Sequence, residues 1–171
     1  MEKRTVVIGE KTFTLLGQPV QVGAPAPDAE LTANDFSSVK LSSYSGRPRL
    51  ISVVYSLETG ICDAQTHKFN EAATKLGGDV VVLTISADLP FTQKRWCGAS
   101  GLQNVITLSD YKEMAFANAY GLHIQERRVT SRAVFVVDRQ NVVRYAEYLP
   151  VIGSQPNYGA ALEALRQVSG K

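Results

Sequence analysis

Residues 50–85 read LISVVYSLETGICDAQTHKFNEAATKLGGDVVVLTI, and their pattern decides the fold class. Residues 50–55 and 80–85 are mostly apolar and rich in Val and Ile, which is typical of strands buried on both faces of a sheet. The segment between them carries an apolar stripe at helical spacing: Phe69, Ala72, Ala73 and Leu76. Two glycines, Gly77 and Gly78, end that stripe. The order strand, helix, strand predicts a βαβ unit.

Further elements are expected on both sides of this unit. Residues 5–8 and 12–16 predict a hairpin near the N-terminus. After residue 85, Asp88 is expected to cap a short helix that has Pro90 in its first turn and ends at Gly98, just beyond Cys97. The remaining pattern predicts strands at 104–108, 133–137 and 142–148, and helices at 112–119 and from about Asn157 onward.

This order suits one α/β domain over residues 1–171, of the thioredoxin-like class, with an N-terminal β-hairpin and a central mixed sheet flanked by helices. A flavodoxin-like, doubly wound sheet is the structural competitor. It would need a phosphate-binding loop after the first core strand. Residues 56–61 read SLETGI, with one acid and one glycine, so they make a poor anion site.

The composition excludes several classes of partner. The chain has 171 residues, 44% of them hydrophobic, and a net charge of +2 without runs of like charge. This balance points neither to nucleic acid nor to a membrane surface as partner. The apolar runs are too short to span a bilayer, and no secretory signal is recognisable behind Met1, so a cytoplasmic location is expected.

Only two cysteines occur, Cys62 and Cys97. By number they are either inert core residues or a redox pair. Together with His67 and His123 they reach the ligand count of a zinc site, but no short paired spacing supports one. Cys62 follows a strand and a short loop, in the first turn of a helix, where free amide groups favour a thiolate. Thr59 can cap this helix and place a hydroxyl beside the sulfur; a buried thiol with a plain helix cap fits equally well.

Four segments carry a resemblance to a known family. Residues 56–62, SLETGIC, resemble the peroxidatic loop of peroxiredoxins, whose pattern is Pro-x-x-x-Thr-x-x-Cys. Residues 86–99, SADLPFTQKRWCGA, are similar to the resolving-cysteine helix of bacterial thiol peroxidases, the atypical two-cysteine subgroup. Residues 104–110 and 132–138 match the same subgroup. The resemblance covers nearly the whole chain, the N-terminal hairpin included.

The resemblance implies a thiol-specific peroxidase acting on hydrogen peroxide and organic hydroperoxides. Cys62 would be the peroxidatic nucleophile, Thr59 would hydrogen-bond the sulfur and the peroxide, and Arg132 would keep the sulfur ionised. Cys97 would resolve the sulfenic acid as an intramolecular disulfide, which a thioredoxin-type donor reduces. The family implies a homodimer and no metal or prosthetic group. The residues alone do not choose Arg132 over the other candidates: Arg127, Arg128 and Arg144.

One position departs from the family pattern. Tyr55 stands where the peroxidatic loop opens with proline, so we expect it to cover or crowd the peroxide pocket. A peroxide sensor or disulfide relay with the same cysteine pair is therefore the alternative function, and a non-catalytic interaction domain is a second one. Trp96 is expected to fill the core or a dimer interface, and it could also anchor its helix; His67 is expected to lie on a solvated helix face.

Overall fold

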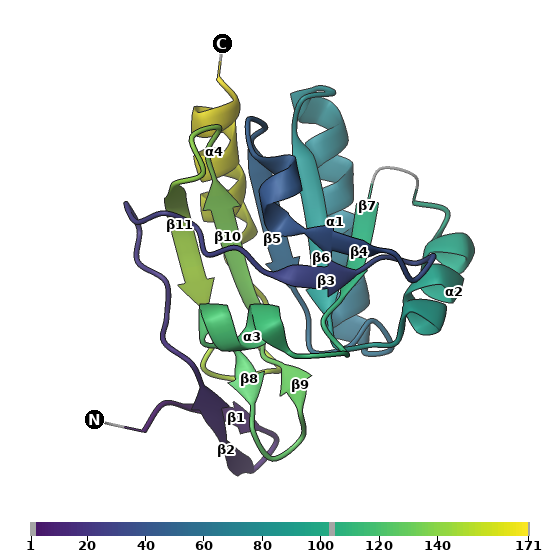
Figure 1. The fold of residues 1–171 in the computed structure, drawn as a ribbon, viewed down its shortest axis with the longest axis vertical. Coiled ribbons are helices and arrows are strands. Elements are labelled where there is room, and N and C mark those ends of the chain that lie inside the picture. The colour runs from purple at the N-terminus through teal and green to yellow at the C-terminus, as the bar shows by residue number, and fades with distance from the viewer. Residues whose placement is uncertain (1–2, 103–104, 171) are drawn as a thin grey trace.

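The computed structural model describes residues 3–102 and 105–170. The strand predicted at 50–55 is β5 (Arg49–Val53), an interior strand of a seven-stranded sheet with the order β11-β10-β5-β6-β7-β3-β4 (Figure 1). The other strands of this sheet are β3 (Glu30–Thr32), β4 (Ser38–Lys40), β6 (Val81–Ser86), β7 (Val105–Ser109), β10 (Ala133–Val137) and β11 (Val143–Tyr148).

The predicted βαβ unit is present. β5, β6 and β7 are parallel, and α1 (Gly60–Leu76) connects β5 to β6. On either side of this parallel core the pairing is antiparallel, β10 with β5 and β3 with β7. The mixed sheet confirms the thioredoxin-like class and removes the flavodoxin-like alternative, whose core strands would be parallel.

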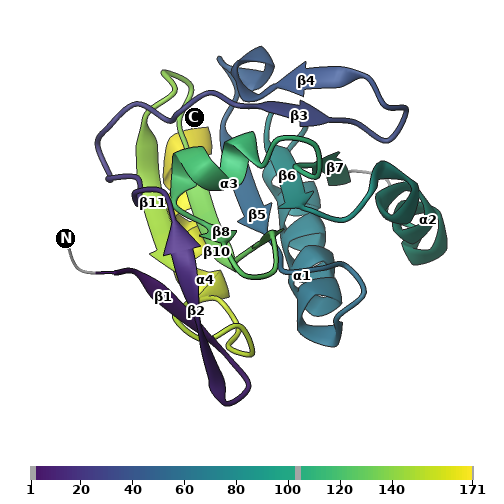
Figure 2. The ribbon, with the colours of Figure 1, turned by 60° about the horizontal axis from the view of Figure 1, so that its bottom comes forward.

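Helices cover both faces of the sheet. α1 and α4 (Tyr158–Ser169) share one hydrophobic cluster with the sheet, and α3 (Ala115–Tyr120) contributes to the cluster on the opposite face (Figures 1 and 2). α2 (Pro90–Ser100) packs beside β7 at the edge of this arrangement. A 3₁₀ turn, η1 (Leu41–Tyr44), leads into β5.

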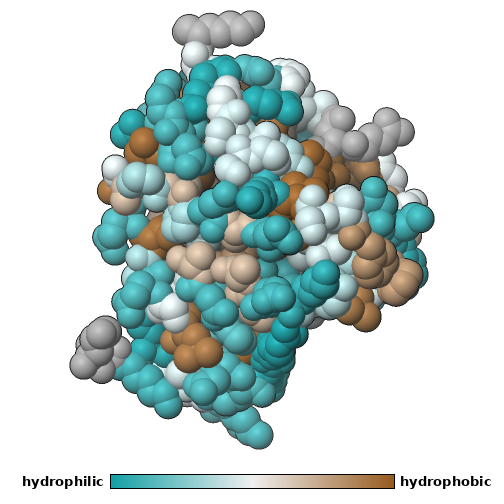
Figure 3. Space-filling model, viewed as in Figure 1, coloured by the Kyte–Doolittle hydropathy of each residue, from teal (hydrophilic) through white to brown (hydrophobic). Residues whose placement is uncertain are grey.

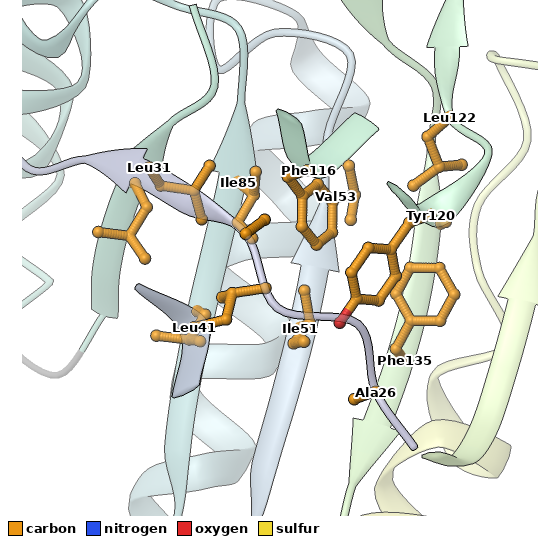
Figure 4. Packing of buried hydrophobic residues seen from close by; sticks show 14 of the residues in the cluster. Ala26, Leu31, Leu41, Ile51, Val53, Ile85, Phe116, Tyr120, Leu122 and Phe135 are labelled. Carbon is orange, nitrogen blue, oxygen red and sulfur yellow. The ribbon is translucent and has the colours of Figure 1, made fainter. Parts of the chain in front are cut away.

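Alternation along β5 explains why both faces are covered. Leu50 belongs to the cluster of α1 and α4, whereas Ile51 and Val53 belong to the cluster that contains Phe116 and Tyr120 of α3 (Figure 4). Successive strand residues point to opposite faces of a sheet, so an unbroken apolar run requires apolar cover on both. The buried β5 therefore ends in a fixed position, from which the loop to Cys62 starts.

The predicted N-terminal hairpin is formed by β1 (Thr5–Ile8) and β2 (Lys11–Leu16). It extends into a four-stranded sheet through β8 (His123–Ile124) and β9 (Val129–Thr130), neither of which was predicted. His123 lies in β8. β3 and β4 were missed as well, because strands of two or three residues carry too little alternation to be recognised.

Two helix boundaries differ from the expectation. Gly98 does not end α2, which continues to Ser100 and is closed by Gly101 in the left-handed region at φ +71°. Asp88 does not cap α2 either: Leu89 occupies the N-cap position, without a side-chain hydrogen bond. Cys97 therefore lies inside the last turn of a longer helix than predicted.

The helix predicted at 112–119 starts at Ala115. Asp110 explains the delay, because its carboxylate accepts hydrogen bonds from the backbone N–H groups of Phe116 (3.1 Å) and Ala117 (2.8 Å). Met114, the N-cap residue, has a positive φ of 52°. The strand expected from Asn104 is found as β7 from Val105; Asn104 itself lies outside the described residues.

Apolar side chains are exposed next to the start of α2. Phe91 is 69% exposed, Leu89 49% and Phe36 45%, and the rings of Phe36 and Phe91 are in contact at 4.8 Å between centroids. Brown, apolar surface is visible in this region of Figure 3. Within residues 3–102 and 105–170, no helix has the length and apolar character needed to cross a bilayer.

Candidate active site

Cys62 lies in the first turn of α1 and is fully buried. It belongs to a hydrophobic cluster with Val54, Leu57 and Trp96, and both Cys62 and Cys97 are free thiols. Backbone N–H groups in the first turn of a helix have no partner within the helix and carry partial positive charge. The sulfur thus lies at the end of α1 where such groups are found, as the sequence predicted.

Thr59 occupies the N-cap position of α1, but its side chain does not cap the helix. Its hydroxyl donates a hydrogen bond to the carbonyl oxygen of Ser56 at 3.0 Å, and its own carbonyl accepts from the N–H of Asp63 at 3.0 Å. The hydroxyl is thus held within the loop that leads to Cys62. Because its single proton is donated to Ser56, the hydroxyl oxygen keeps both lone pairs as hydrogen-bond acceptors.

Asp88 organises this loop, a role that the sequence analysis missed. One carboxylate oxygen accepts from the Ser56 hydroxyl at 2.8 Å, and the other accepts from the Leu57 N–H at 2.9 Å and from the Ser86 hydroxyl at 2.7 Å. The carboxylate therefore joins the end of β6 to the start of the Cys62 loop. The sequence holds one indication of this role: an aspartate shortly after a predicted parallel strand lies at the edge of the sheet where the neighbouring βα loop also starts.

Arg132 is the buried arginine of the four candidates. Its side chain is 1% exposed; Nε donates to the carbonyl oxygen of Ile152 at 3.0 Å, and Nη1 donates to Oε1 of Gln65 at 2.9 Å. Gln65 in turn donates from Nε2 to the Ser52 hydroxyl at 2.7 Å. Gln65 is fully buried on α1, one turn after Cys62, so this network fixes the guanidinium against the helix that carries the sulfur.

No carboxylate forms an ion pair with Arg132 among the residues that the structure describes. The other three arginines, Arg127, Arg128 and Arg144, are exposed. Burying a guanidinium without a counter-charge is costly in free energy unless an anion is present. The guanidinium of Arg132 is held by Gln65, which lies three residues after Cys62 on α1.

Tyr158 is a further member of the site that sequence reasoning missed. Its hydroxyl is buried and makes no hydrogen bond to any residue that the structure describes, and its ring contacts Phe69 of α1 at 5.2 Å between centroids. Burial raises the pKa of Tyr158; the positive charge of Arg132 opposes this rise and negative charge on Cys62 adds to it. The first turn of α4 therefore lies within electrostatic reach of both groups.

Cys97 packs against the same hydrophobic cluster as Cys62, on the side of α2. Its sulfur is 3.4 Å from the Thr107 hydroxyl on β7, and that hydroxyl donates to Oδ1 of Asn34 at 3.0 Å. Trp96, its neighbour, anchors α2 as expected: the ring is 9% exposed and Nε1 donates to Oδ1 of Asp63 at 2.9 Å. The two cysteines thus lie on either side of one cluster, each on its own helix.

Tyr55 is half-buried in the loop between β5 and α1. Its ring packs against two clusters, that of Cys62 and that of Val6, Ile124 and Ile152. The hydroxyl oxygen accepts a hydrogen bond from Nη1 of Arg127 at 2.7 Å. This contact between Arg127 and Tyr55 was not predicted from the sequence.

The two histidines lie apart from this centre. His67 is partly exposed on α1, with Nε2 3.6 Å from Oδ1 of Asp63, and Nδ1 of His123 is 2.8 Å from Oδ1 of Asn118. Over the described ranges, His, Cys, Asp and Glu side chains do not gather into a group of three that could hold a metal ion.

Comparisons with known proteins agree with this arrangement. Residues 21–162 match the Redoxin family. The chain is 48% identical to the thiol peroxidase of Staphylococcus saprophyticus over 163 residues, covering 95% of this chain and 98% of that protein. It is 50% identical to the thiol peroxidase of Bacillus subtilis over 153 residues, covering 90% and 91%.

Solved structures show the same fold. A peroxiredoxin-like protein from Aquifex aeolicus superposes with a TM-score of 0.86 at 32% identity, covering 96% of this chain and 97% of that one. A thiol peroxidase from Chromobacterium violaceum superposes with a TM-score of 0.85 at 24% identity, covering 97% of each chain. The second similarity supports the fold alone.

Proposed function

Because the chain belongs to the thiol peroxidases of the Redoxin family and is a peroxidase enzyme, we propose that it reduces hydrogen peroxide and organic hydroperoxides with Cys62 as the attacking sulfur. The Cys62 thiolate attacks one peroxide oxygen, so that an S–O bond forms while the O–O bond breaks. The departing oxygen takes a proton and leaves as water or an alcohol. Cys62 is then a sulfenic acid.

The observation that carries this proposal is the buried guanidinium of Arg132, which is bound to Gln65 of the Cys62 helix and lacks a carboxylate partner among the described residues. A fixed positive charge at this position stabilises the thiolate before the reaction and the developing oxyanion during it. Thr59 and the unpaired hydroxyl of Tyr158 supply hydrogen-bonding groups for the peroxide oxygens. Nothing in this reaction requires a metal or a prosthetic group.

Cys97 completes the cycle in our proposal. Its sulfur attacks the sulfenic sulfur of Cys62, an S–S bond forms, and the hydroxyl leaves as water. A thioredoxin-type dithiol then donates two electrons to reduce the intramolecular disulfide. The supporting observation is that both cysteines contact one hydrophobic cluster, although they lie on different helices.

We further propose that residues 1–171 form a single domain acting as a cytoplasmic homodimer. The exposed apolar side chains of Phe36, Leu89 and Phe91 are surface that a second copy could cover. Sedimentation equilibrium tests the dimer directly.

The decisive experiment measures peroxide consumption with thioredoxin, thioredoxin reductase and NADPH. We expect sustained turnover of hydrogen peroxide by the wild type and none by Cys62→Ser, since serine has no accessible anion at neutral pH. Turnover by Cys62→Ser at the wild-type rate would refute the assignment. A wild type that is oxidised once by peroxide but is not turned over would instead indicate the sensor or relay function.

A further inference from the structure

The residues next to the two cysteines are hydrogen-bonded to each other. Asp63 follows Cys62 on α1, Trp96 precedes Cys97 on α2, and Nε1 of Trp96 donates to Oδ1 of Asp63 at 2.9 Å. The edge of the His67 ring packs on Trp96 at 5.8 Å between centroids. The bond therefore joins the two helices within one residue of both reactive sulfurs.

In the reduced structure, α2 presents Trp96 to Asp63, and Cys97 contacts β7 instead. Consecutive side chains on an α-helix project about 100° apart, and neighbours i and i+1 do not share a face. While Trp96 faces Asp63 on α1, Cys97 is directed to β7, where its sulfur lies 3.4 Å from the Thr107 hydroxyl. Turning Cys97 toward Cys62 has to move Trp96 away from Asp63.

We propose that Asp63 and Trp96 are positioning residues, whose hydrogen bond holds Cys97 away from Cys62 until Cys62 is oxidised and thereby sets the rate of disulfide closure. This inference rests on the proposed function, in which Cys97 resolves the sulfenic acid of Cys62. The bond stabilises the reduced arrangement and is lost before the S–S bond forms. The bond therefore slows the attack of Cys97 on the sulfenic acid of Cys62. The sulfenic acid lives longer as a result, and a second peroxide has more time to over-oxidise it.

The test separates the peroxide step from the closure step by rapid quenching, with sulfenic acid and disulfide measured by mass spectrometry. Trp96→Phe keeps an aromatic ring, removes the N–H donor and makes the side chain smaller. We expect this variant to accelerate disulfide closure by roughly threefold to tenfold, which corresponds to the net free energy of one hydrogen bond. The rate of Cys62 oxidation by peroxide should stay within about twofold of the wild-type rate. Less over-oxidised Cys62 should accumulate at high peroxide concentrations.

Companion variants separate the hydrogen bond from packing. Asp63→Asn retains an oxygen acceptor, so its disulfide should close at the wild-type rate. In Asp63→Ala the acceptor is lost, and disulfide closure should be accelerated as much as in Trp96→Phe. Adding Trp96→Phe to Asp63→Ala should then cause no further acceleration. Additive effects of the two changes would assign the effect to ring packing and overturn the proposal.

Arg95→Gln is the matched control. It removes the ion pair of Arg95 on α2 with Glu58 in the loop before α1, and both of these side chains are more than half exposed. Exposed ion pairs contribute little free energy, so the rate of disulfide closure should stay within about twofold of the wild-type rate. Acceleration equal to that of Trp96→Phe would show general loosening of α2 and overturn the specific role of Asp63 and Trp96.

Trp96 is the only tryptophan of the chain, so its fluorescence reports directly on this bond. The signal should change with disulfide closure in the wild type and stay constant in Cys97→Ser after peroxide. Constant fluorescence during closure, with equal closure rates in all variants, would overturn this inference alone. Absence of sulfenic acid on Cys62 would instead overturn the proposed function.

Discussion

Nη1 of Arg127 donates a hydrogen bond to the Tyr55 hydroxyl at 2.7 Å, while the same guanidinium lies over the Phe13 ring, 4.4 Å from its centroid. Phe13 belongs to β2, and Arg127 to the turn between β8 and β9. The four-stranded sheet of β1, β2, β8 and β9 is thus connected through Arg127 to the loop that leads to Cys62. Tyr55, which stands where related loops have proline, is held in place by a contact that proline cannot make.

We expect Tyr55 to restrict which peroxides reach Cys62, because its ring packs against the cluster that contains the sulfur. Tyr55→Ala should raise kcat/KM for cumene hydroperoxide relative to hydrogen peroxide by roughly tenfold, as expected when a pocket wall is removed. Tyr55→Phe keeps the ring and should leave this ratio within about twofold. Steady-state assays with both peroxides decide. An unchanged ratio in Tyr55→Ala would place Tyr55 outside the pocket.

Arg132 is predicted to act in the peroxide step through both charge and geometry. Arg132→Met should slow oxidation of Cys62 by roughly 10²- to 10³-fold. Arg132→Lys should recover little of the rate, since one ammonium cannot reproduce the separate bonds from Nε to Ile152 and from Nη1 to Gln65. Stopped-flow oxidation under single-turnover conditions measures this step.

The control for Arg132 is Arg144→Met, because Arg144 is an exposed arginine paired with Asp138. Its peroxide step should stay within about twofold of wild type. If Arg132→Met reacted at the wild-type rate, the electrostatic role would belong to another cation.

The sequence allowed the fold to be predicted for a physical reason, whereas the roles of the two sulfurs depend on the family resemblance. Buried strands such as residues 50–55 and 80–85 need apolar side chains at every position, and a cysteine at a helix start is visible as local pattern. The choice of Arg132 over Arg127 depended on the family resemblance, because burial of an arginine is decided by residues distant in the sequence. Its partner Gln65 looked like an ordinary helix residue.

The roles of Asp88 and Tyr158 could not be predicted from the sequence for the same reason: they depend on contacts between segments that are distant in the chain. Asp88 matched a helix cap in sequence, yet its carboxylate binds Ser56 and Leu57, about thirty residues earlier, as only the parallel pairing of β5 with β6 makes possible. Tyr158 matched an apolar helix stripe, and the packing of α4 on α1 brings its hydroxyl near Arg132. Roles that arise from pairing between distant segments leave no local signature.

Cys97→Ser should separate oxidation from resolution. We expect it to consume one equivalent of peroxide per chain and then stop, because Cys97 is the other cysteine of the chain. Cys62 should then be found as sulfenic acid with a dimedone trap, and as sulfinic acid at higher peroxide concentrations. Continued turnover with thioredoxin alone would mean that Cys62 is reduced without Cys97.

Asp110 is predicted to make stability depend on pH. Burial raises the pKa of Asp110 to about 6 from 3.8, against the hydrogen bonds from Ala117 and Phe116 that lower it. A carboxyl with a higher pKa in the folded state contributes stability below its unfolded pKa and loses it as pH rises through about 6. Between pH 7.5 and pH 5.0, the wild type should therefore gain about 1.4 kcal/mol in free energy of unfolding relative to Asp110→Asn. Urea unfolding at both pH values tests this; a constant difference would contradict it.

Disulfide closure is predicted to unwind helix locally while the sheet stays fixed. Cys62 is in the first turn of α1 and Cys97 in the last turn of α2, and a disulfide needs Cα atoms within about 7 Å. Glycine weakens a helix by about 0.5–1 kcal/mol relative to alanine, and Gly60 and Gly98 lie beside the two cysteines. Hydrogen exchange should show that residues 59–66 and 92–101 lose protection in the disulfide form, whereas β5 and β6 do not. Equal protection in both redox forms would show that Cys97 reaches Cys62 without unwinding.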